Sequence, residues 1–283
     1  MATPAYSIQS EDLGYYACGG KEGNRDIINC SSALELFHSA TLIHDDIIDQ
    51  SPYRRGKQSA HLKYSISEAL TMGRLVMVKG FELVKGVKVF FEPDIIFDMI
   101  NAELEEGYAE HNVNAGIESY LSIINGKTAT LMRTASSIGA GIAGASSEMR
   151  VSAEEYGYNL GMAFQITDDL LDLISTEAAL GKSTRIDVCT GKFTLPILLA
   201  FEDASKGDKI KLQLSNQALS SDSIECIIND IMETDAIERS LEMAEMFISN
   251  AIDSTSMFSD SVFSESLRHL AKYVVDRVST PDI

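Results

Sequence analysis

Apolar residues recur at every third or fourth position along most of this 283-residue chain, a spacing typical of amphipathic helices. No proline lies between Pro93 and Pro196, and the apolar–polar alternation of β-strands is nearly absent. We therefore expect an all-α fold of roughly eight to ten helices and no sheet. The predicted helices are 31–50, 67–84, 94–111, 117–143, 153–174 and 194–204, with two or three more between 222 and 278.

Three segments interrupt this helical pattern. An irregular N-terminal segment is expected to end at Gly19 and Gly20, because paired glycines break helices. Polar loops are expected at 51–57 and at 175–192, where glycine, serine, threonine and charged residues gather. No stretch has the composition of a linker, so residues 1–283 are expected to form a single domain.

The net charge of −19 limits the partners that the protein can take. Nucleic-acid binding needs a basic surface, and an acidic chain is repelled by anionic membranes, so we expect neither partner. No apolar run approaches 18 residues and the N-terminus lacks a basic and then apolar segment, so we expect neither stable membrane insertion nor a secretory signal. Four cysteines without CxxC spacing indicate reduced thiols, which is typical of a cytoplasmic protein.

Two acidic motifs of the form DDxxD lie late in predicted helices, DDIID at 45–49 and DDLLD at 168–172. The first and last aspartates of each motif share a helix face, where like charges destabilise the helix. A cation would compensate for them, and magnesium binds through one or two carboxylates together with substrate phosphates. A solvated acidic face is the alternative, but apolar residues flank both motifs. We therefore expect the two motifs to clamp a diphosphate from facing helices.

Basic residues follow both motifs at positions suited to phosphate binding. SPYRRGK at 51–57 places Arg54 and Arg55 after the first motif, and arginine forks bind phosphate oxygens in pairs. Lys127 interrupts an apolar helix, and Lys182 and Lys192 follow the second motif. These are not Walker loops, because the GxxxxGK frame after a strand is missing. Each cation alone is typical of a surface residue, but beside the acidic motifs they indicate a diphosphate site.

These segments together resemble one enzyme family. Residues 31–61 and 161–200 resemble the two aspartate-rich regions of trans-isoprenyl diphosphate synthases of the geranylgeranyl diphosphate type, and residues 119–140 resemble that family's central Lys-Thr helix. The resemblance implies a bundle of antiparallel helices around a deep central cavity, a homodimer, and about three Mg²⁺ ions in each active site. It also implies condensation of isopentenyl diphosphate with an allylic diphosphate, head to tail.

The resemblance further assigns roles to individual residues. The implied metal ligands are Asp45, Asp46, Asp49, Asp168, Asp169 and Asp172. The implied catalytic set is Asp45, Asp49, Asp168, Lys127, Lys192 and Arg54. The residues implied to bind the two diphosphates are His38, Arg54, Arg55, Lys127, Thr128, Gln165, Lys182 and Lys192, of which His38 and Arg55 would face isopentenyl diphosphate.

The half of the site that would bind isopentenyl diphosphate departs from the family pattern. Family members carry a Gly-Gly-Lys-x-x-Arg-Pro segment well before the first motif, whereas this chain has no basic residue before Lys21. Arg74 stands where the family usually has aspartate. Three explanations are open: the sequence lacks its true N-terminus, isopentenyl diphosphate binds more weakly or differently, or the chain has left condensation chemistry.

Two other functions are also open from the sequence. One is another ionising enzyme, such as a terpene cyclase or lyase, and the other is a non-catalytic subunit of a heteromeric synthase. Cyclases usually lack a second intact DDxxD motif, and non-catalytic subunits typically lose aspartates. Both motifs are intact here, which favours the synthase.

The length of the product is expected to depend on the helix that carries the first motif. Ala40 lies five residues before Asp45, about 7.5 Å along the helix axis, and Phe37 lies about 12 Å along it. In the family an aromatic residue at the five-before position stops the growing chain early. Because Ala40 is small, we expect Phe37 to be the first large residue that blocks the chain, unless it is plain core packing. The predicted product is C20, with C25 or C30 next and C15 last.

Overall fold

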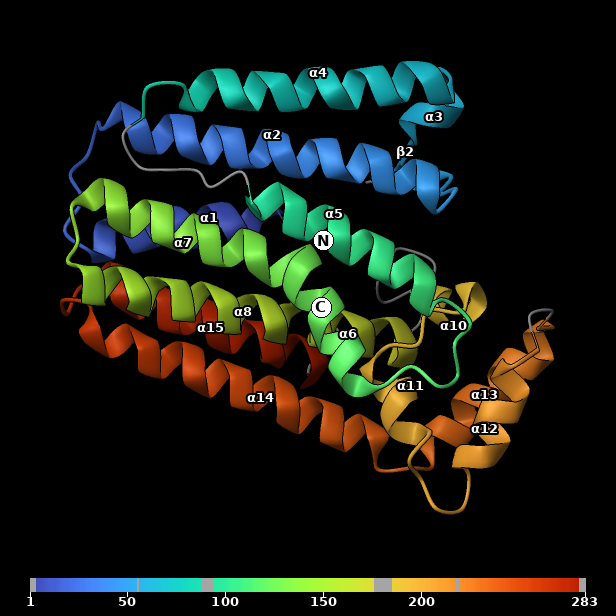
Figure 1. Cartoon of the computed structure of the whole chain (residues 1–283). Coiled ribbons are helices and arrows are strands. Elements are labelled where there is room, and N and C mark those ends of the chain that lie inside the picture. Colours follow the sequence, from blue (N-terminus) through green and yellow to red (C-terminus); the bar gives the residue numbers. More distant parts are fainter. Residues whose placement is uncertain (1–3, 55, 88–93, 176–184, 217–218, 280–283) are drawn as a thin grey trace. The chain divides into compact units, whose positions relative to one another are not determined.

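A computed structural model describes residues 4–54, 56–87, 94–175, 185–216 and 219–279 (Figure 1). The all-α prediction is confirmed, because the described secondary structure is helical apart from the short hairpin of β1 and β2. The described residues form two compact units, and each is considered by itself. That residues 1–283 form one domain stays a prediction.

The first unit is drawn from Met1–Glu92, Thr134–Glu154 and Met257–Glu265. Its own elements are α1 (Pro4–Ala17), α2 (Arg25–Ile48), β1 (Tyr53–Arg54), β2 (Lys57–Gln58), α3 (Ala60–Lys63) and α4 (Ile66–Val84). The side chain of Asn24 caps α2 by accepting a hydrogen bond from the N–H of Asp26, and Asp26 suits the positive end of the helix dipole. The apolar face of α2 is buried along its length.

Helices α2 and α4 lie side by side, and two glycines of α4 allow their close approach (Figure 1). A Cβ at Gly80 would lie 2.6 Å from the ring of Phe37, and a Cβ at Gly73 would lie 2.6 Å from Nε2 of His44. The ring of Phe37 also contacts the ring of Phe81, with 4.8 Å between centroids. Phe37 is therefore packed between α2 and α4.

The second unit is drawn from Pro93–Arg133, Glu155–Ser256 and Ser266–Ile283. Its own elements are α5 (Asp94–Ala109), α6 (Ile117–Ile124), the π-helix η1 (Asn125–Ala129), α10 (Ile186–Thr190), α11 (Leu195–Ala200), α12 (Gly207–Leu214), α13 (Ser221–Met232) and α14 (Ala236–Ser254). Three longer helices contribute residues to both units: α7 (Thr130–Ala143), α8 (Ser147–Ile174) and α15 (Val262–Ser279). The 3₁₀ turn η2 (Thr255–Met257) follows α14.

The core of the second unit surrounds the C-terminal half of α8. Phe164, Ile166 and Leu170 are almost fully buried there, as is Leu195 of α11. The hydroxyl of Tyr156 donates a buried hydrogen bond of 2.8 Å to the carbonyl of Leu267, which ties α8 to α15. The part of α8 that carries the second acidic motif is therefore packed into this core.

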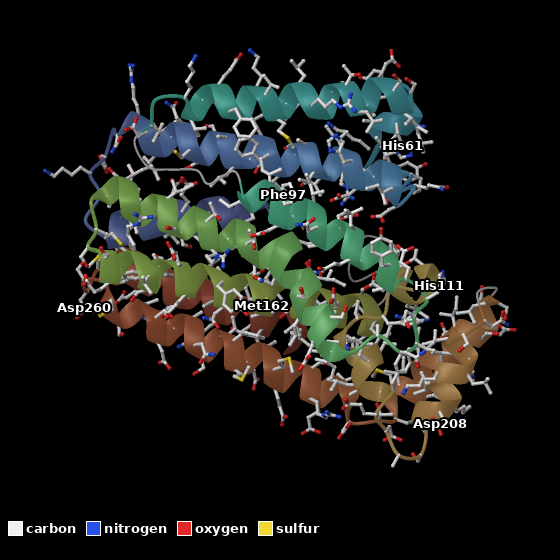
Figure 2. The ribbon with its side chains drawn as sticks, viewed as in Figure 1. His61, Phe97, His111, Met162, Asp208 and Asp260 are labelled. Carbon is white, nitrogen blue, oxygen red and sulfur yellow. The ribbon has the colours of Figure 1, made fainter. Side chains whose placement is uncertain are left out.

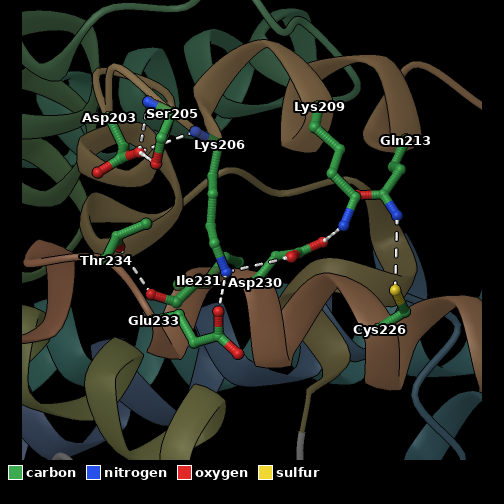
Figure 3. Close-up of polar contacts among 10 residues, drawn as sticks. All are labelled: Asp203, Ser205, Lys206, Lys209, Gln213, Cys226, Asp230, Ile231, Glu233 and Thr234. Atoms are coloured by element: carbon green, nitrogen blue, oxygen red, sulfur yellow. Dashed lines mark hydrogen bonds and ion pairs between the residues drawn. The ribbon is translucent and has the colours of Figure 1, made fainter.

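A polar cluster connects α12 to α13 at the surface of the second unit (Figure 3). Lys206 and Lys209 both pair with Asp230, and Lys206 also pairs with Glu233. The carboxylate of Asp203 caps the turn before α12 by accepting hydrogen bonds from the backbone N–H groups at 205 and 206. All these cations have acidic partners, which is typical of a structural ion-pair network.

Several predicted boundaries differ from the structure. The prediction of an irregular N-terminal segment is wrong, because α1 is helical and buries an apolar face with Tyr15 and Ala17. The predicted break follows it at Gly19, whose φ is 88°. The predicted helix 117–143 is interrupted by η1, and α10 lies inside the predicted loop 175–192. The absence of a sheet is also wrong, because β1 and β2 pair over two residues across a turn at Gly56 (φ 73°).

None of the helices in the described ranges is long and apolar enough to span a membrane.

Two helical glycines with different surroundings are expected to respond in opposite ways to substitution by alanine. A Cβ at Gly161 would lie 2.5 Å from Cα of Ala129, so Gly161→Ala must displace backbone. We expect it to lower the free energy of unfolding by about 1–3 kcal/mol. Gly107 of α5 has nothing within 4 Å of its missing Cβ, so Gly107→Ala should raise that free energy by about 0.4–1 kcal/mol. Urea unfolding measures both, and equal effects would contradict the described packing.

Candidate active site

The first acidic motif lies at the C-terminal end of α2, in the first unit. Asp46 is buried and accepts two hydrogen bonds from Arg54, at 2.9 Å from Nε and 2.7 Å from Nη2. The strand β1 presents Arg54 to the motif, and Arg55 lies outside the described residues. Asp49 caps the helix with its N–H bonded to the carbonyl of Asp45, so these two residues lie one turn apart as predicted. The structure thus brings the first motif and one arginine together.

Three further predicted residues lie on α2. Phe37, His38 and Ala40 are all buried. Phe37 is packed against α4, as described above. Their roles toward substrate stay predictions.

The second motif lies in the last turns of α8, and its middle aspartate is held by a buried network. Asp169 accepts hydrogen bonds from the hydroxyl of Tyr120, at 2.6 Å, and from the amide of Gln165, at 2.8 Å. The oxygen of Gln165 in turn accepts a bond of 2.8 Å from the hydroxyl of Thr128. Burial raises the pKa of Asp169 to about 7, and the neighbouring charges of Asp168 and Asp172 act in the same direction.

The outer aspartates of this motif have partners of their own. Asp168 pairs with Arg277 of α15, whose guanidinium also lies 5.0 Å from the centre of the Phe164 ring. Asp172 accepts a bond of 3.4 Å from the N–H of Asp187, at the start of α10. Burial raises the pKa of Asp187 well above its usual value, and the charges of Asp169 and Asp172 add to that rise. Four acidic side chains are thus crowded at this end of α8.

Two of the predicted lysines meet on one carboxylate. Lys127 of η1 and Lys192, before α11, each donate to the same oxygen of Glu106, at 2.6 Å and 2.9 Å from their Nζ atoms. Lys127 also pairs with Glu103 at 2.7 Å. Lys182 lies outside the described residues.

A cavity of about 200 Å³ opens beside this lysine pair in the second unit. Lys127, Lys192, Gln165 and Asp169 line it together with apolar residues of α6 and α11. Predicted residues from three separate stretches of sequence therefore converge on one space.

The structure contains one observation against a metal site and one that favours it. Among the described residues, no three histidine, cysteine or acidic side chains are grouped in a way that could hold a metal ion. Both acidic motifs nevertheless lie at helix C-termini, and neither α2 nor α8 has a basic residue in its last turn. Negative charge is unfavourable at that end of a helix dipole, so each motif is suited to a bound cation.

Some residues of the second unit were not predicted from the sequence. They are Glu103, Glu106, Tyr120, Asp187 and Arg277. In the sequence, Glu103 and Glu106 look like ordinary acidic residues on the surface of a helix. Their lysine partners lie 21 residues or more along the chain, so no local pattern reveals the contacts. Asp187 had a usable signal, since it lies between the second motif and Lys192 in a stretch already singled out.

Comparisons with known proteins agree on one family. A family model described as polyprenyl synthetase matches residues 12–231. The chain is 34% identical to a geranylgeranyl diphosphate synthase of Sulfolobus acidocaldarius over 87% of this chain and 79% of that protein. It is 32% identical to heptaprenyl diphosphate synthase component 2 of Bacillus subtilis over 86% of this chain and 71% of that protein.

A solved structure extends the agreement to the fold. The polyprenyl synthase of Caulobacter crescentus, complexed with calcium and isoprenyl diphosphate, is 28% identical and superposes with a TM-score of 0.86. That match covers 97% of this chain and 84% of the other. The chain belongs to the polyprenyl synthetase family and is a prenyltransferase that elongates trans-prenyl diphosphates.

Proposed function

We propose that the chain condenses isopentenyl diphosphate with an allylic diphosphate to a C20 or somewhat longer product, using the residues assembled above. The observation that supports this most is the cavity of the second unit, where Lys127 and Lys192 lie beside Asp169 and Gln165. Two ammonium groups beside an acidic motif suit a metal-bound diphosphate. Members of the family bind allylic and isopentenyl diphosphates and generally use Mg²⁺.

The donor set fits magnesium. The proposed ligands are Asp45, Asp49 and Asp168, with Asp46, Asp169 and Asp172 in support. All are hard oxygen donors. Burial raises the pKa of Asp169 and the neighbouring charges of Asp168 and Asp172 add to that rise, so a cation there would offset their repulsion. We propose about three ions, the number that the family resemblance implies. When bound, magnesium would act as a Lewis acid that offsets the charge of the departing diphosphate.

The cationic side chains are proposed to divide between the two substrates. Lys127, Lys192 and Arg54 hold the allylic diphosphate by charge-assisted hydrogen bonds. Thr128 and Gln165 orient Asp169, through the bonds described above, and Lys182 is proposed to line the same site. Arg55 and His38 are proposed to face isopentenyl diphosphate.

In this reaction the protein binds and orients the two substrates and excludes water from them. The allylic carbon–oxygen bond breaks, and the double bond of isopentenyl diphosphate supplies the electron pair of the new carbon–carbon bond. A proton then leaves the adjacent carbon, with the released pyrophosphate as its acceptor. The lysines stabilise the growing negative charge of the leaving group, and the apolar walls of α6 and α11 exclude water that would quench the cation.

A homodimer is part of this proposal. Four large apolar side chains of α5 are exposed at a spacing of three or four residues, namely Phe97, Ile100, Leu104 and Tyr108. They share one helix face, and such an exposed face is typical of an interface. The relative named component 2 favours a heteromer as the alternative.

Light scattering of the purified chain should give twice the mass of the monomer. Leu104→Glu places a charge on the exposed apolar face and should reduce the measured mass to that of one chain. A monomeric wild type would contradict the homodimer.

The metal ligands give the sharpest test of the proposed function. Asp45→Asn and Asp168→Asn keep the shape of each side chain but remove its charge. We expect each to lower turnover of geranyl diphosphate and isopentenyl diphosphate by about a hundredfold or more, with the helical content unchanged. Asp260→Asn, at an exposed loop position (Figure 2), is the matched control and should change nothing. Near wild-type rates for both motif variants at ordinary magnesium would refute the proposed metal clamp.

Product length gives an independent test of the role of α2. Phe37→Ala should lengthen the product, because it removes the first large side chain below Ala40, and Ala40→Phe should shorten it. The contact of Phe37 with Phe81 suggests that Phe81→Ala added to Phe37→Ala lengthens the product further. Chromatography of the dephosphorylated products measures all three. An unchanged product ladder from a normally folded Phe37→Ala would place the length limit elsewhere.

A further inference from the structure

Glu106 of α5 lies at the centre of the lysine pair. Its Oε2 atom accepts a hydrogen bond from Lys127 and another from Lys192, at 2.6 Å and 2.9 Å. The two ammonium groups therefore share one oxygen atom, although they come from different elements of the second unit. The three side chains are mostly buried and line the same cavity.

Two close backbone approaches hold α5 in the position that this contact needs. A Cβ at Gly126, beside Lys127, would lie 2.4 Å from Cβ of Ala102, so only glycine lets η1 lie this close to α5. Just after the end of α5, the N–H of His111 donates a bond of 2.8 Å to the carbonyl of Gly191, the neighbour of Lys192. Figure 2 labels His111. Helix α5 is thus fastened beside each lysine, with Glu106 between the two attachments.

The charges explain why a carboxylate is needed at this point. Burial alone would raise the pKa of Glu106, but Lys127 and Lys192 lower it below its usual value. Burial acts to lower the pKa of Lys127, but Glu106 and Glu103 raise it. Glu106 and Lys127 are therefore both charged at neutral pH. Without the carboxylate, two neighbouring ammonium groups in a partly dry site would repel each other.

We propose that Glu106 is a positioning residue, which holds the ammonium groups of Lys127 and Lys192 together so that both meet the same incoming diphosphate. Lys127 donates to two carboxylates and has three N–H groups, so one remains for a phosphate oxygen. Preorganised cations bind an anion more tightly than cations that must first be brought together. The inference rests on the proposed diphosphate site, and it adds a residue from a helix to which the sequence assigned no function.

The alternative interpretation is that the carboxylate of Glu106 competes with the diphosphate for the two lysines. Removal of its charge would then tighten pyrophosphate binding, whereas positioning predicts that binding weakens. The two readings differ in sign, so one measurement separates them.

The experiment uses calorimetric titration of the full chain with pyrophosphate in the presence of Mg²⁺. Glu106→Gln keeps the shape but cannot hold two ammonium groups by charge, and we expect binding about tenfold weaker. The KM for geranyl diphosphate should rise by a similar factor, while kcat changes much less, because both lysines remain. Glu105→Gln is the matched control: Glu105 is exposed on the same helix and contacts Ser122 instead. It should match the wild type.

Glu106→Asp supplies a second arm should the glutamine variant fold poorly. Its carboxylate is one methylene shorter and cannot reach both lysines at their present positions, so binding between wild type and Glu106→Gln is expected. Binding by both Glu106 variants that is equal to or tighter than wild type overturns the positioning role. Lys127→Ala and Lys192→Ala separate this failure from that of the proposed function: if both bind pyrophosphate normally, the diphosphate site itself is wrong, and the role of Glu106 falls with it.

Discussion

Buried like charges repel, and the second unit is organised around that constraint. Asp168, Asp169, Asp172 and Asp187 crowd the C-terminal end of α8, where the helix dipole is also unfavourable to negative charge. The protein answers with specific partners: Tyr120 and Gln165 donate to Asp169, and Arg277 pairs with Asp168. Lys127 and Lys192 nearby also carry like charges that repel each other. Glu103 and Glu106 offset that repulsion by pairing with them. Under the proposed function, each cluster binds a ligand of opposite charge.

Close helix packing makes these arrangements possible. Gly126 and Gly161 let η1 approach α5 on one side and α8 on the other, so Lys127 and Thr128 reach partners on different helices. A π-helical turn at this point is consistent with function, because such turns occur often at functional sites. Gly126, Thr128 and Ala129 of this turn are buried. Packing and chemistry are therefore coupled in the same five residues.

The sequence predicted the parts of the site that lie in local patterns. The two DDxxD motifs fall late in α2 and α8, as expected, and Lys127, Thr128, Gln165 and Lys192 gather beside the second motif. The sequence could not reveal Glu106 or Tyr120, because each acts through a residue far along the chain and neither interrupts a hydrophobic pattern. It also missed η1, since a π-helical turn preserves helical spacing on both sides. The helix α1 was missed because two of its buried residues, Ser10 and Glu11, are polar, so the sequence shows no clear apolar face there.

The central claim is that the second acidic motif and the lysine pair serve one diphosphate. Crystals of the chain grown with pyrophosphate and Mn²⁺, as a stand-in for magnesium, test it directly through anomalous scattering. A metal peak should lie beside Asp168, with pyrophosphate bound to that metal and to Lys127 and Lys192. No metal beside Asp168, or pyrophosphate bound away from the two lysines, would contradict the claim.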